Sequence, residues 1–382
     1  MLSSIRDRLS HLRARAPRDY GRLSLASKII YLSLIPTALI YLIARLSPTF
    51  SDFFNRYISQ PLRWLYAKLT NLLPFSLAEG LLLLLPVLLG LLLWHAVRKR
   101  TATRRHMLIY TAEILSVAAL LLVIFVWNFG IGYYTSPLNA PDKLDLQRTD
   151  VSAQQLYDTA LILVDQVNAH AAEVEYRYDD FSIMPYSRGE MNRKLLAAYE
   201  DFCTEYDFMD TFGSRVKPVM LSEAMSYTHI TGVYSYFTGE ANLNVVFPDY
   251  SLPYTAAHEL AHQRGIAREN EANFIAFLVC IRSDDPYIRY SGYLNLYEYV
   301  ASALYRADPT LYSDARSRLV SPVRQELRAY SAFFDKYRDS AVSEVSGAIN
   351  NSYLQLQGTE GTRSYGLVVD LAVAYYGKSE PR

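Results

Sequence analysis

The chain has few cysteines and no excess of charge of either sign. Its 382 residues include two cysteines, Cys203 and Cys280, which allow one bridge or two free thiols but exclude a disulfide framework. Because 38 basic residues balance 38 acidic ones, charge gives no case for nucleic acid as a partner. The sequence also lacks internal repeats and low-complexity tracts, so a repeat architecture or a long disordered region is not expected.

Apolar residues are concentrated in the first third of the chain. They form three runs, at about 29–47, 80–97 and 107–133, each long enough to cross a hydrocarbon core of about 30 Å. Pro36 and Pro86 fall inside the first two runs, which membrane helices tolerate. We therefore expect residues 1–133 to form a membrane domain with three transmembrane helices. Loop 49–79, which is aromatic and sparsely charged, suits an interfacial amphipathic helix.

The first run has the basic front and apolar centre of a signal peptide. However, Arg45-Leu46-Ser47-Pro48 is not a small-x-small cleavage site, and two more runs follow, so we expect the first run to be a retained anchor. The N-terminal segment and the loop 98–105 are strongly basic, whereas loop 49–79 has three basic residues. The positive-inside rule then predicts a multi-pass protein of the cell membrane, with a cytoplasmic N-terminus and an extracytoplasmic C-terminal domain.

The remainder of the chain is mixed in character and rich in tyrosine. Residues 134–150 resemble a linker, and 151–382 are expected to form a mostly α, α+β domain. Helical patterns cover about 152–174 and 188–206, and many residues after 268. The stretches Val216–Leu221 and Ala241–Phe247 are the best strand candidates, so a small sheet precedes the helix discussed next.

His258, Glu259 and His262 form a His-Glu-x-x-His motif. On a helix, His258 and His262 lie on one face and can bind the same metal ion, with Glu259 beside them. Zinc lowers the pKa of a water ligand towards about 7, and a nearby carboxylate can take the proton. The pattern therefore favours a zinc hydrolase with Glu259 as the general base.

A third ligand has to come from outside the motif helix. The following helix is expected to begin near Arg268 and carries Glu269, Glu271 and Asn273. Glu269 and Asn273 share a face of that helix, which favours Glu269 as the ligand and Asn273 as support for a histidine. Glu271 is the alternative ligand. A bland interpretation, two histidines on an ordinary surface helix, competes with this one.

The motif and its sequel resemble the gluzincin branch of zinc metallopeptidases. In that branch the third ligand is a glutamate that opens a Glu-x-x-(Ala/Ser)-(Asp/Asn) helix, which Glu269-x-x-Ala272-Asn273 matches. The resemblance implies a zincin-like domain in which His258, His262 and Glu269 bind one zinc ion and Glu259 acts as the general base. Two features depart from the gluzincin pattern. Only six residues separate His262 from Glu269, which is a short spacing. Gly265 resembles the glycine of the metzincin turn, although the metzincin ligand position holds Arg268. The whole layout also resembles a bacterial multi-pass membrane family of unknown function with three N-terminal spans and a HELAHQRG domain.

Two weaker expectations come from the same resemblance. Gluzincins bind an extended peptide along an edge strand, a role that Asn242, Leu243 and Asn244 would fill here. Zincins often stabilise the oxyanion with a tyrosine or histidine, for which the candidates are Tyr290, Tyr293 and His229. Ordinary packing is the competing interpretation for the tyrosines, because the chain has 32 of them.

These observations predict a membrane-anchored zinc metallopeptidase that hydrolyses a peptide or protein substrate. The alternative is a catalytically inactive metal-binding domain that recognises a peptide or a cell-wall component. An intramembrane protease is excluded, because the segment 251–268 is too polar to lie in lipid. The oligomeric state and the substrate stay open.

Overall fold

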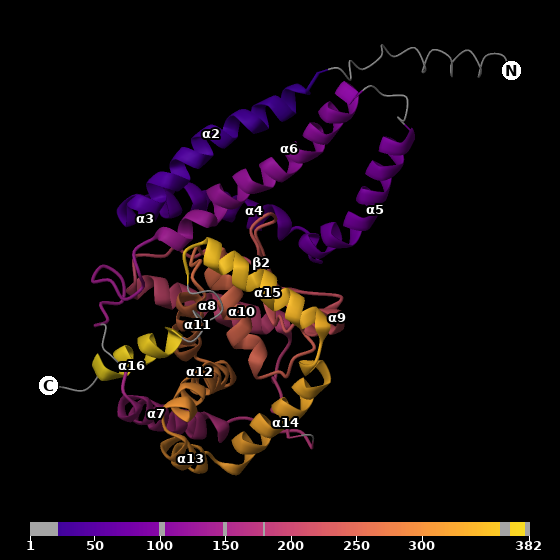
Figure 1. The fold of residues 1–382 in the computed structure, drawn as a ribbon. Coiled ribbons are helices and arrows are strands. Elements are labelled where there is room, and N and C mark those ends of the chain that lie inside the picture. The colour runs from indigo at the N-terminus through magenta and orange to yellow at the C-terminus, as the bar shows by residue number, and fades with distance from the viewer. Residues whose placement is uncertain (1–21, 99–103, 148–150, 179, 360–366, 379–382) are drawn as a thin grey trace.

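A computed structural model describes residues 22–98, 104–147, 151–178, 180–359 and 367–378. Figure 1 shows three long helices on one side of the molecule and a mostly helical body with a small sheet on the other. The predicted orientation depends on basic residues of which most, Arg6 to Arg18 and Lys99 and Arg100, lie outside the described ranges. The coarse prediction of apolar N-terminal helices followed by a helical domain with a small sheet is confirmed.

The three long apolar helices are α2 (Leu25–Leu46), α5 (Leu77–Arg98) and α6 (Arg104–Asn128), and each is long and apolar enough to cross a membrane. Helices α2 and α6 run side by side and are joined by polar contacts (Figure 1). Trp127 Nε1 on α6 donates to Thr37 Oγ1 on α2 at 3.0 Å, and the Tyr31 hydroxyl donates to the Ala112 carbonyl at 2.6 Å. Such hydrogen bonds join helices where apolar burial cannot. Helix α5 stands apart, exposed along its length.

The third apolar helix ends earlier than predicted, at Asn128 and not at Tyr133. Arg63 Nη1 donates to the Asn128 carbonyl at 2.6 Å, which satisfies the helix end. The chain then forms a 3₁₀ turn, η2 (Gly130–Tyr134), whose first four residues are buried. A side chain on Gly132 would crowd Ala267 and the Gly265 carbonyl, so this close approach requires glycine. The apolar pattern continued to Tyr133 because these residues enter the protein core.

Between α2 and α5 the chain forms α3 (Pro48–Phe54), a π-helical turn η1 (Asn55–Ser59) and α4 (Gln60–Thr70). This is the stretch predicted as an interfacial helix. Its exposed face is apolar, with Trp64 46% and Leu69 57% exposed, but its other face packs against the body. There Arg63 is fully buried, and burial lowers its pKa to about 10. In addition to Asn128, its guanidinium donates to Asn55 and Gln60.

Residues 134–147 contribute buried leucines to the core, whereas the sequence predicted a linker over 134–150. Leu138, Leu144 and Leu146 are all buried in the main hydrophobic cluster. The Leu138 amide donates to Glu271 Oε1 at 2.8 Å, and Ser136 is bound by Asp52 of α3. The polar residues and prolines that suggested a linker therefore form a packed irregular segment.

One hydrophobic core fills the body. Helix α11 (Glu269–Arg282) is buried along nearly its whole length, between α8, α10, α12 and α16. Helix α12 packs along α7. The remaining helices are α7 (Ala153–Ala171), α8 (Arg188–Glu205), α9 (Ser222–Ser226), α10 (Ser251–Gln263), α12 (Pro286–Ala307), α13 (Pro309–Ser317), α14 (Ser321–Arg338), α15 (Ala341–Leu356) and α16 (Val368–Lys378).

The sheet has three short strands, β1 (Lys217–Pro218), β2 (Gly232–Ser235) and β3 (Glu240–Leu243), in the order β1-β3-β2. Strand β3 pairs in parallel with β1 and antiparallel with β2. Both predicted strands exist but are shorter than expected. Asn242 and Asn244, which gave the predicted strand its polar face, are buried. They donate to the carbonyls of Val233 in β2 and of Ile230 just before it.

A buried ion pair joins this sheet to the apolar helix α5. Lys217 Nζ and Glu240 Oε1 are 2.5 Å apart, and both side chains are almost fully buried. The Glu240 carboxylate also accepts from the backbone amides of Leu77 and Ala78, at 3.0 and 2.8 Å. A carboxylate at a helix N-terminus satisfies free amides and complements the helix dipole. The apolar helix therefore starts directly on the sheet.

Arg63→Ala should destabilise the whole protein, because it removes the donors for Asn128, Asn55 and Gln60 at once. Leaving these buried acceptors unpaired should cost about 3 kcal/mol of unfolding free energy. Thermal unfolding of the full chain in detergent measures this. Lys68→Ala, an exposed change on the same helix, is the control and should leave the midpoint unchanged. Equal midpoints for the two variants would contradict the assigned role of Arg63.

Candidate metal centre

The motif lies on α10, a helix that is buried on nearly all sides. Its N-terminus has no capping side chain of its own. Instead Ser291 of α12 accepts from the Tyr254 amide at 3.1 Å and donates to the Tyr250 carbonyl. The start of the helix is therefore fixed by its packing partner, and Pro253 occupies the first turn, where no amide hydrogen is needed.

The end of α10 is a tight turn at Gly265. This glycine has φ +100°, and Gly265 and Ile266 donate back to the carbonyls of His262 and Ala261, at 2.9 and 3.1 Å. Such a left-handed ending is common after helices and favours glycine. Any side chain here would also overlap the guanidinium of Arg63. Asn55 Nδ2 donates to the Gly265 carbonyl at 3.2 Å, so α4 and η1 hold this turn from behind.

Gln263 and Arg264, which follow the motif, are structural. Gln263 donates to the Gly239 carbonyl at 2.6 Å and accepts from Ser214 at 2.6 Å, which joins the helix to the sheet hairpin. The Arg264 guanidinium lies 4.1 Å from the ring centre of Tyr199 and donates to the Phe212 carbonyl at 3.1 Å. A buried cation stacked on an aromatic ring is stabilised by the ring quadrupole.

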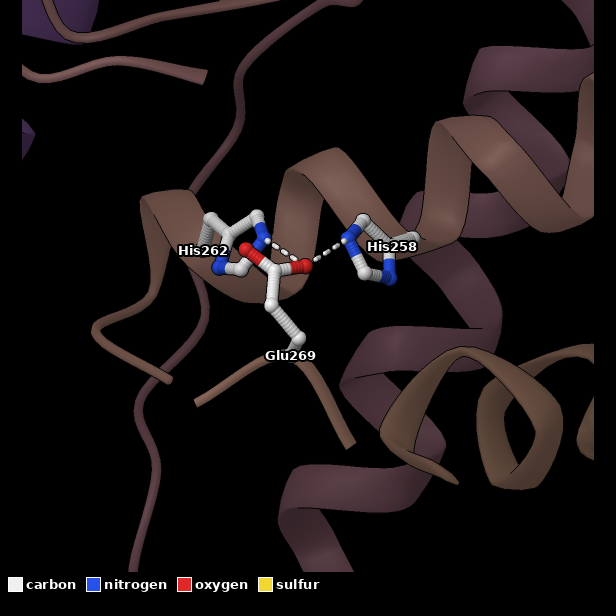
Figure 2. Close-up of side chains that lie close together, drawn as sticks. All are labelled: His258, His262 and Glu269. Atoms are coloured by element: carbon white, nitrogen blue, oxygen red, sulfur yellow. Dashed lines mark ion pairs between the residues drawn. The ribbon is translucent and has the colours of Figure 1, made fainter. Parts of the chain in front are cut away.

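The turn brings Glu269, the first residue of α11, back to the two histidines. Figure 2 shows one carboxylate oxygen of Glu269 lying between the imidazoles. Glu269 Oε2 is 3.3 Å from His258 Nε2 and 3.6 Å from His262 Nε2. Donors of a tetrahedral ion at about 2 Å lie roughly 3.3 Å apart, which this spacing approaches. Among the described residues, this is the one group of three or more His, Cys, Asp or Glu side chains whose ligand atoms all lie within 4.8 Å of one another.

Apart from Glu269, no other group binds Nε2 of either histidine in the described residues. His262 Nδ1 lies 2.7 Å from the Ile266 carbonyl, and a proton on Nδ1 would leave Nε2 available as a ligand. His258 Nδ1 is buried without a hydrogen-bond partner. These three residues therefore fit a zinc-type ion by donor chemistry and by spacing.

The charges of the cluster are strongly coupled. Burial lowers the pKa of His262, but the carboxylate of Glu269 outweighs it and raises the pKa to about 9. Burial raises the pKa of Glu269, but His262 and His258 outweigh it and hold the pKa well below its usual range. Burial disfavours an isolated charge, so the negative carboxylate of Glu269 is stable here only beside positive charge, which a protonated histidine supplies.

Glu259 is buried beside the histidines. Burial raises its pKa, opposed by His258 and His262, and the backbone of Tyr234 donates a hydrogen bond to the carboxylate. Its Oε2 atom has no hydrogen-bond partner. An unpaired buried carboxylate oxygen next to a ligand cluster suits a group that exchanges a proton with a water.

Of the two candidate glutamates, the structure brings only Glu269 to the histidines. Glu271 accepts from the Leu138 amide at 2.8 Å and pairs with Arg268 at 2.9 Å, so it holds the segment that follows α6. Asn273 was predicted to support one of the histidines. Its side-chain amide instead lies beside the Tyr299 hydroxyl, and no hydrogen bond joins it to His258 or His262 in the described ranges.

The three oxyanion candidates lie in other parts of the body. The Tyr290 hydroxyl donates to Glu326, and Tyr293 stacks on His170 with ring centres 5.5 Å apart. His229 Nε2 lies 2.7 Å from the Tyr337 carbonyl, and its ring packs on Phe334. Each of these side chains is bound to a partner outside the cluster, so the structure does not bring the three candidates to the histidines.

The predicted substrate edge, Asn242 to Asn244, is also wrong. Residues 242 and 243 belong to β3, the central strand, and the Asn244 amide is paired with Thr231, so β1 and β2 occupy both edges. Both β3 and the edge strand β2 pack against α10, and Gly232 of β2 approaches Glu259 closely. A Cβ built on Gly232 would be 2.6 Å from Glu259 Oε1 and 2.9 Å from Thr255 Cγ2. The short segment Gly232–Ser235 has no marked alternation, and its glycine suggested a loop.

Three aromatic residues near the cluster were missed. The charge of Glu269 raises the pKa of Tyr299 on α12 and of Tyr353 on α15, after the larger effect of burial. The Phe129 ring lies 5.7 Å from the His262 ring, edge to face. In a chain with 32 tyrosines, no spacing rule singles out Tyr299 or Tyr353.

A groove of about 710 Å³ lies away from the cluster, between α12, α13 and α14. Its walls are aromatic, with Tyr297, Tyr312 and Tyr330, and Glu298 lines it. Burial raises the pKa of Glu298 to about 7, and Glu326 adds to the effect. None of the motif residues lines this groove.

The fold and the cluster define a mostly helical protein with three apolar helices and a buried His-His-Glu site. The chain belongs to the family described as Protein of unknown function (DUF3810), whose model matches residues 50–373. The match includes α4 with Arg63, the motif and all three cluster residues. No curated protein and no solved structure matches the chain.

Gly232→Ala should destabilise the protein and displace Glu259. The added methyl has no room between β2 and α10, and overpacking of this kind costs about 1–3 kcal/mol. Gly347→Ala is the matched control, because a Cβ there meets nothing within 4 Å. Thermal unfolding of both variants tests the contact. A Gly232→Ala protein as stable as Gly347→Ala would show that β2 does not press on Glu259.

Glu298→Gln should stabilise the protein at pH 8 but not at pH 4. The pKa of Glu298 is about 7 in the folded chain, above its value of about 4.3 when unfolded. Its stabilising contribution is therefore complete at low pH, falls as the pH rises from about 4 to 7, and is absent above that. Unfolding midpoints at the two pH values measure this, with exposed Glu344→Gln as the control. A Glu298→Gln effect that is equal at both pH values would contradict the assignment.

Proposed function

We propose that this protein is a membrane-anchored, zinc-dependent metallopeptidase. The observation that carries the proposal is the convergence of His258, His262 and Glu269, with the unpaired carboxylate oxygen of Glu259 beside them. The resemblance of the motif to gluzincins supports the same reading. His258, His262 and Glu269 would hold the ion, which supplies the positive charge that makes a water nucleophilic at neutral pH.

The residues around the ion have separate roles in this proposal. Glu259 accepts the proton of the attacking water and passes it to the leaving amine. The Tyr234 amide orients the Glu259 carboxylate, and the Ile266 carbonyl fixes the ring of His262. Tyr299, which contacts Asn273 on the helix that Glu269 begins, becomes the candidate for the oxyanion.

The membrane part of the proposal places the three apolar helices across a cell membrane. We propose that the N-terminus is cytoplasmic and the body extracytoplasmic, which follows from the basic residues flanking the apolar runs. The substrate would then be a peptide or a protein segment on the outer side. Lipid surrounds α5, whose spanning segment has no buried part.

Metal analysis of the purified full chain tests the site. Wild type and Glu259→Gln should each hold about one zinc ion, and His262→Ala and Glu269→Gln should lose it. Glu271→Gln is the matched control, since it changes the neighbouring glutamate of the same helix and should keep the metal. Wild-type protein without metal after purification in zinc-containing buffer would refute the proposal.

Hydrolysis of a peptide library separates catalysis from binding alone. Wild type should cleave, and Glu259→Gln should lose at least about 100-fold of the rate while it retains zinc. A chelator should abolish the activity and added zinc should restore it. Metal retention without any Glu259-dependent cleavage would instead support the inactive metal-binding domain.

A further inference from the structure

Helix α15 (Ala341–Leu356) turns an apolar face outward, unlike most helices on a water-soluble body. This face carries Val342, Val345, Ile349 and Leu356, which are 55%, 61%, 66% and 75% exposed. Its inward face carries fully buried Leu354 but otherwise mostly polar side chains, with Ser343, Ser346, Asn350 and Tyr353 half-buried. A surface helix in water normally turns its apolar stripe to the core. The outward face of α15 therefore needs an apolar surrounding.

The position of α15 indicates what that surrounding is. Tyr353 packs on Phe125 near the end of α6, with ring centres 6.0 Å apart, and its hydroxyl accepts from Tyr133 at 3.1 Å. Tyr41 of α2 donates to Gln357 just after the end of α15 at 3.2 Å. Figure 1 shows α15 on the side of the body that carries the three apolar helices. The helix is thus attached where α2 and α6 meet the body.

Apolar side chains are also exposed on α4 and on the turn between β2 and β3. Trp64, Leu65 and Leu69 of α4 are 43–57% exposed, and Phe237, at the turn between β2 and β3, is 39% exposed. In α15 itself Glu344 is the one charged residue. A helix with a strong apolar face and little charge favours the interface of a bilayer through apolar burial, without attraction to anionic lipid.

We propose that the outward face of α15 lies on the surface of the lipid bilayer that the apolar helices cross. This inference rests on the proposed membrane crossing but not on zinc or on catalysis. Tyr353 is connected to the cluster through Tyr133 and Phe129, whose ring lies 5.7 Å from the ring of His262. The candidate metal centre would then lie on the side of the body that faces the membrane.

Spin labels on the full chain in phosphatidylcholine nanodiscs test the inference. Labels are attached at Val345→Cys and Ile349→Cys in a Cys203→Ser background, because the other cysteine, Cys280, is fully buried. Collisions with oxygen, which concentrates in lipid, are compared with collisions with a water-soluble nickel chelate. Tyr305→Cys on α12, 57% exposed, serves as the water control, and Leu88→Cys in α5 serves as the lipid control.

We expect both α15 labels to favour oxygen over nickel at least several-fold relative to Tyr305→Cys. Labels at 345 and 349 that match the water control, while Leu88→Cys reports lipid, would overturn the inference and leave the membrane crossing intact. Labels shielded from both reagents would overturn it too, because a protein surface would then cover α15. If Leu88→Cys also reports water, the membrane crossing itself fails, and this inference fails with it.

Discussion

The turn at Gly265 is the constraint on which the rest of the site depends. It reverses the chain after His262 so that Glu269 returns to both imidazoles within a few residues. The turn is possible because glycine adopts φ +100° there and because Arg63 and Asn55 occupy the space behind it. The Ile266 carbonyl, which the same turn presents, then accepts from the ring of His262. The turn at Gly265 therefore sets both the distance of Glu269 from the histidines and the orientation of the His262 ring.

These contacts join the segment with the apolar helices to the body across the predicted boundary at residue 134. Arg63 belongs to the segment between two apolar helices, yet its guanidinium is as buried as any residue of the body. Phe129 follows the third apolar helix and lies against His262, while Glu240 of the sheet binds the first turn of α5. A body cut at residue 134 would lose all of these contacts and would expose Gly265. The family match, which begins at residue 50, covers these contacts as well as the motif.

The sequence predicted the parts of this molecule that depend on local patterns. Apolar runs gave the three long helices, and the spacing of His258, His262 and Glu269 identified residues that the fold brings together. The wrong predictions share one physical origin. A local sequence pattern does not show which residues pack against distant parts of the chain. Residues 129–133 looked like lipid-facing chain because they pack in the second hydrophobic cluster, with Phe125 and Tyr234. Residues 134–147 looked like a linker because their buried leucines are widely spaced. The order of strands, and therefore which edge lies beside Glu259, depends on long-range pairing that no local pattern records.

The segment after the third apolar helix and α15 show that similar apolar patterns can face either the core or the outside of the protein. Both carry apolar faces, but η2 after α6 turns its residues into the core, and α15 turns its valines and isoleucine away from it. In water the second arrangement would be unfavourable, because polar side chains take interior positions that apolar ones could fill. It becomes favourable if the inward face surrounds a polar site and the outward face has left water. Tyr353 meets the first condition through its hydrogen bond with Tyr133, which packs on Phe129 beside His262. Attachment to the ends of α2 and α6 supplies a reason for the second.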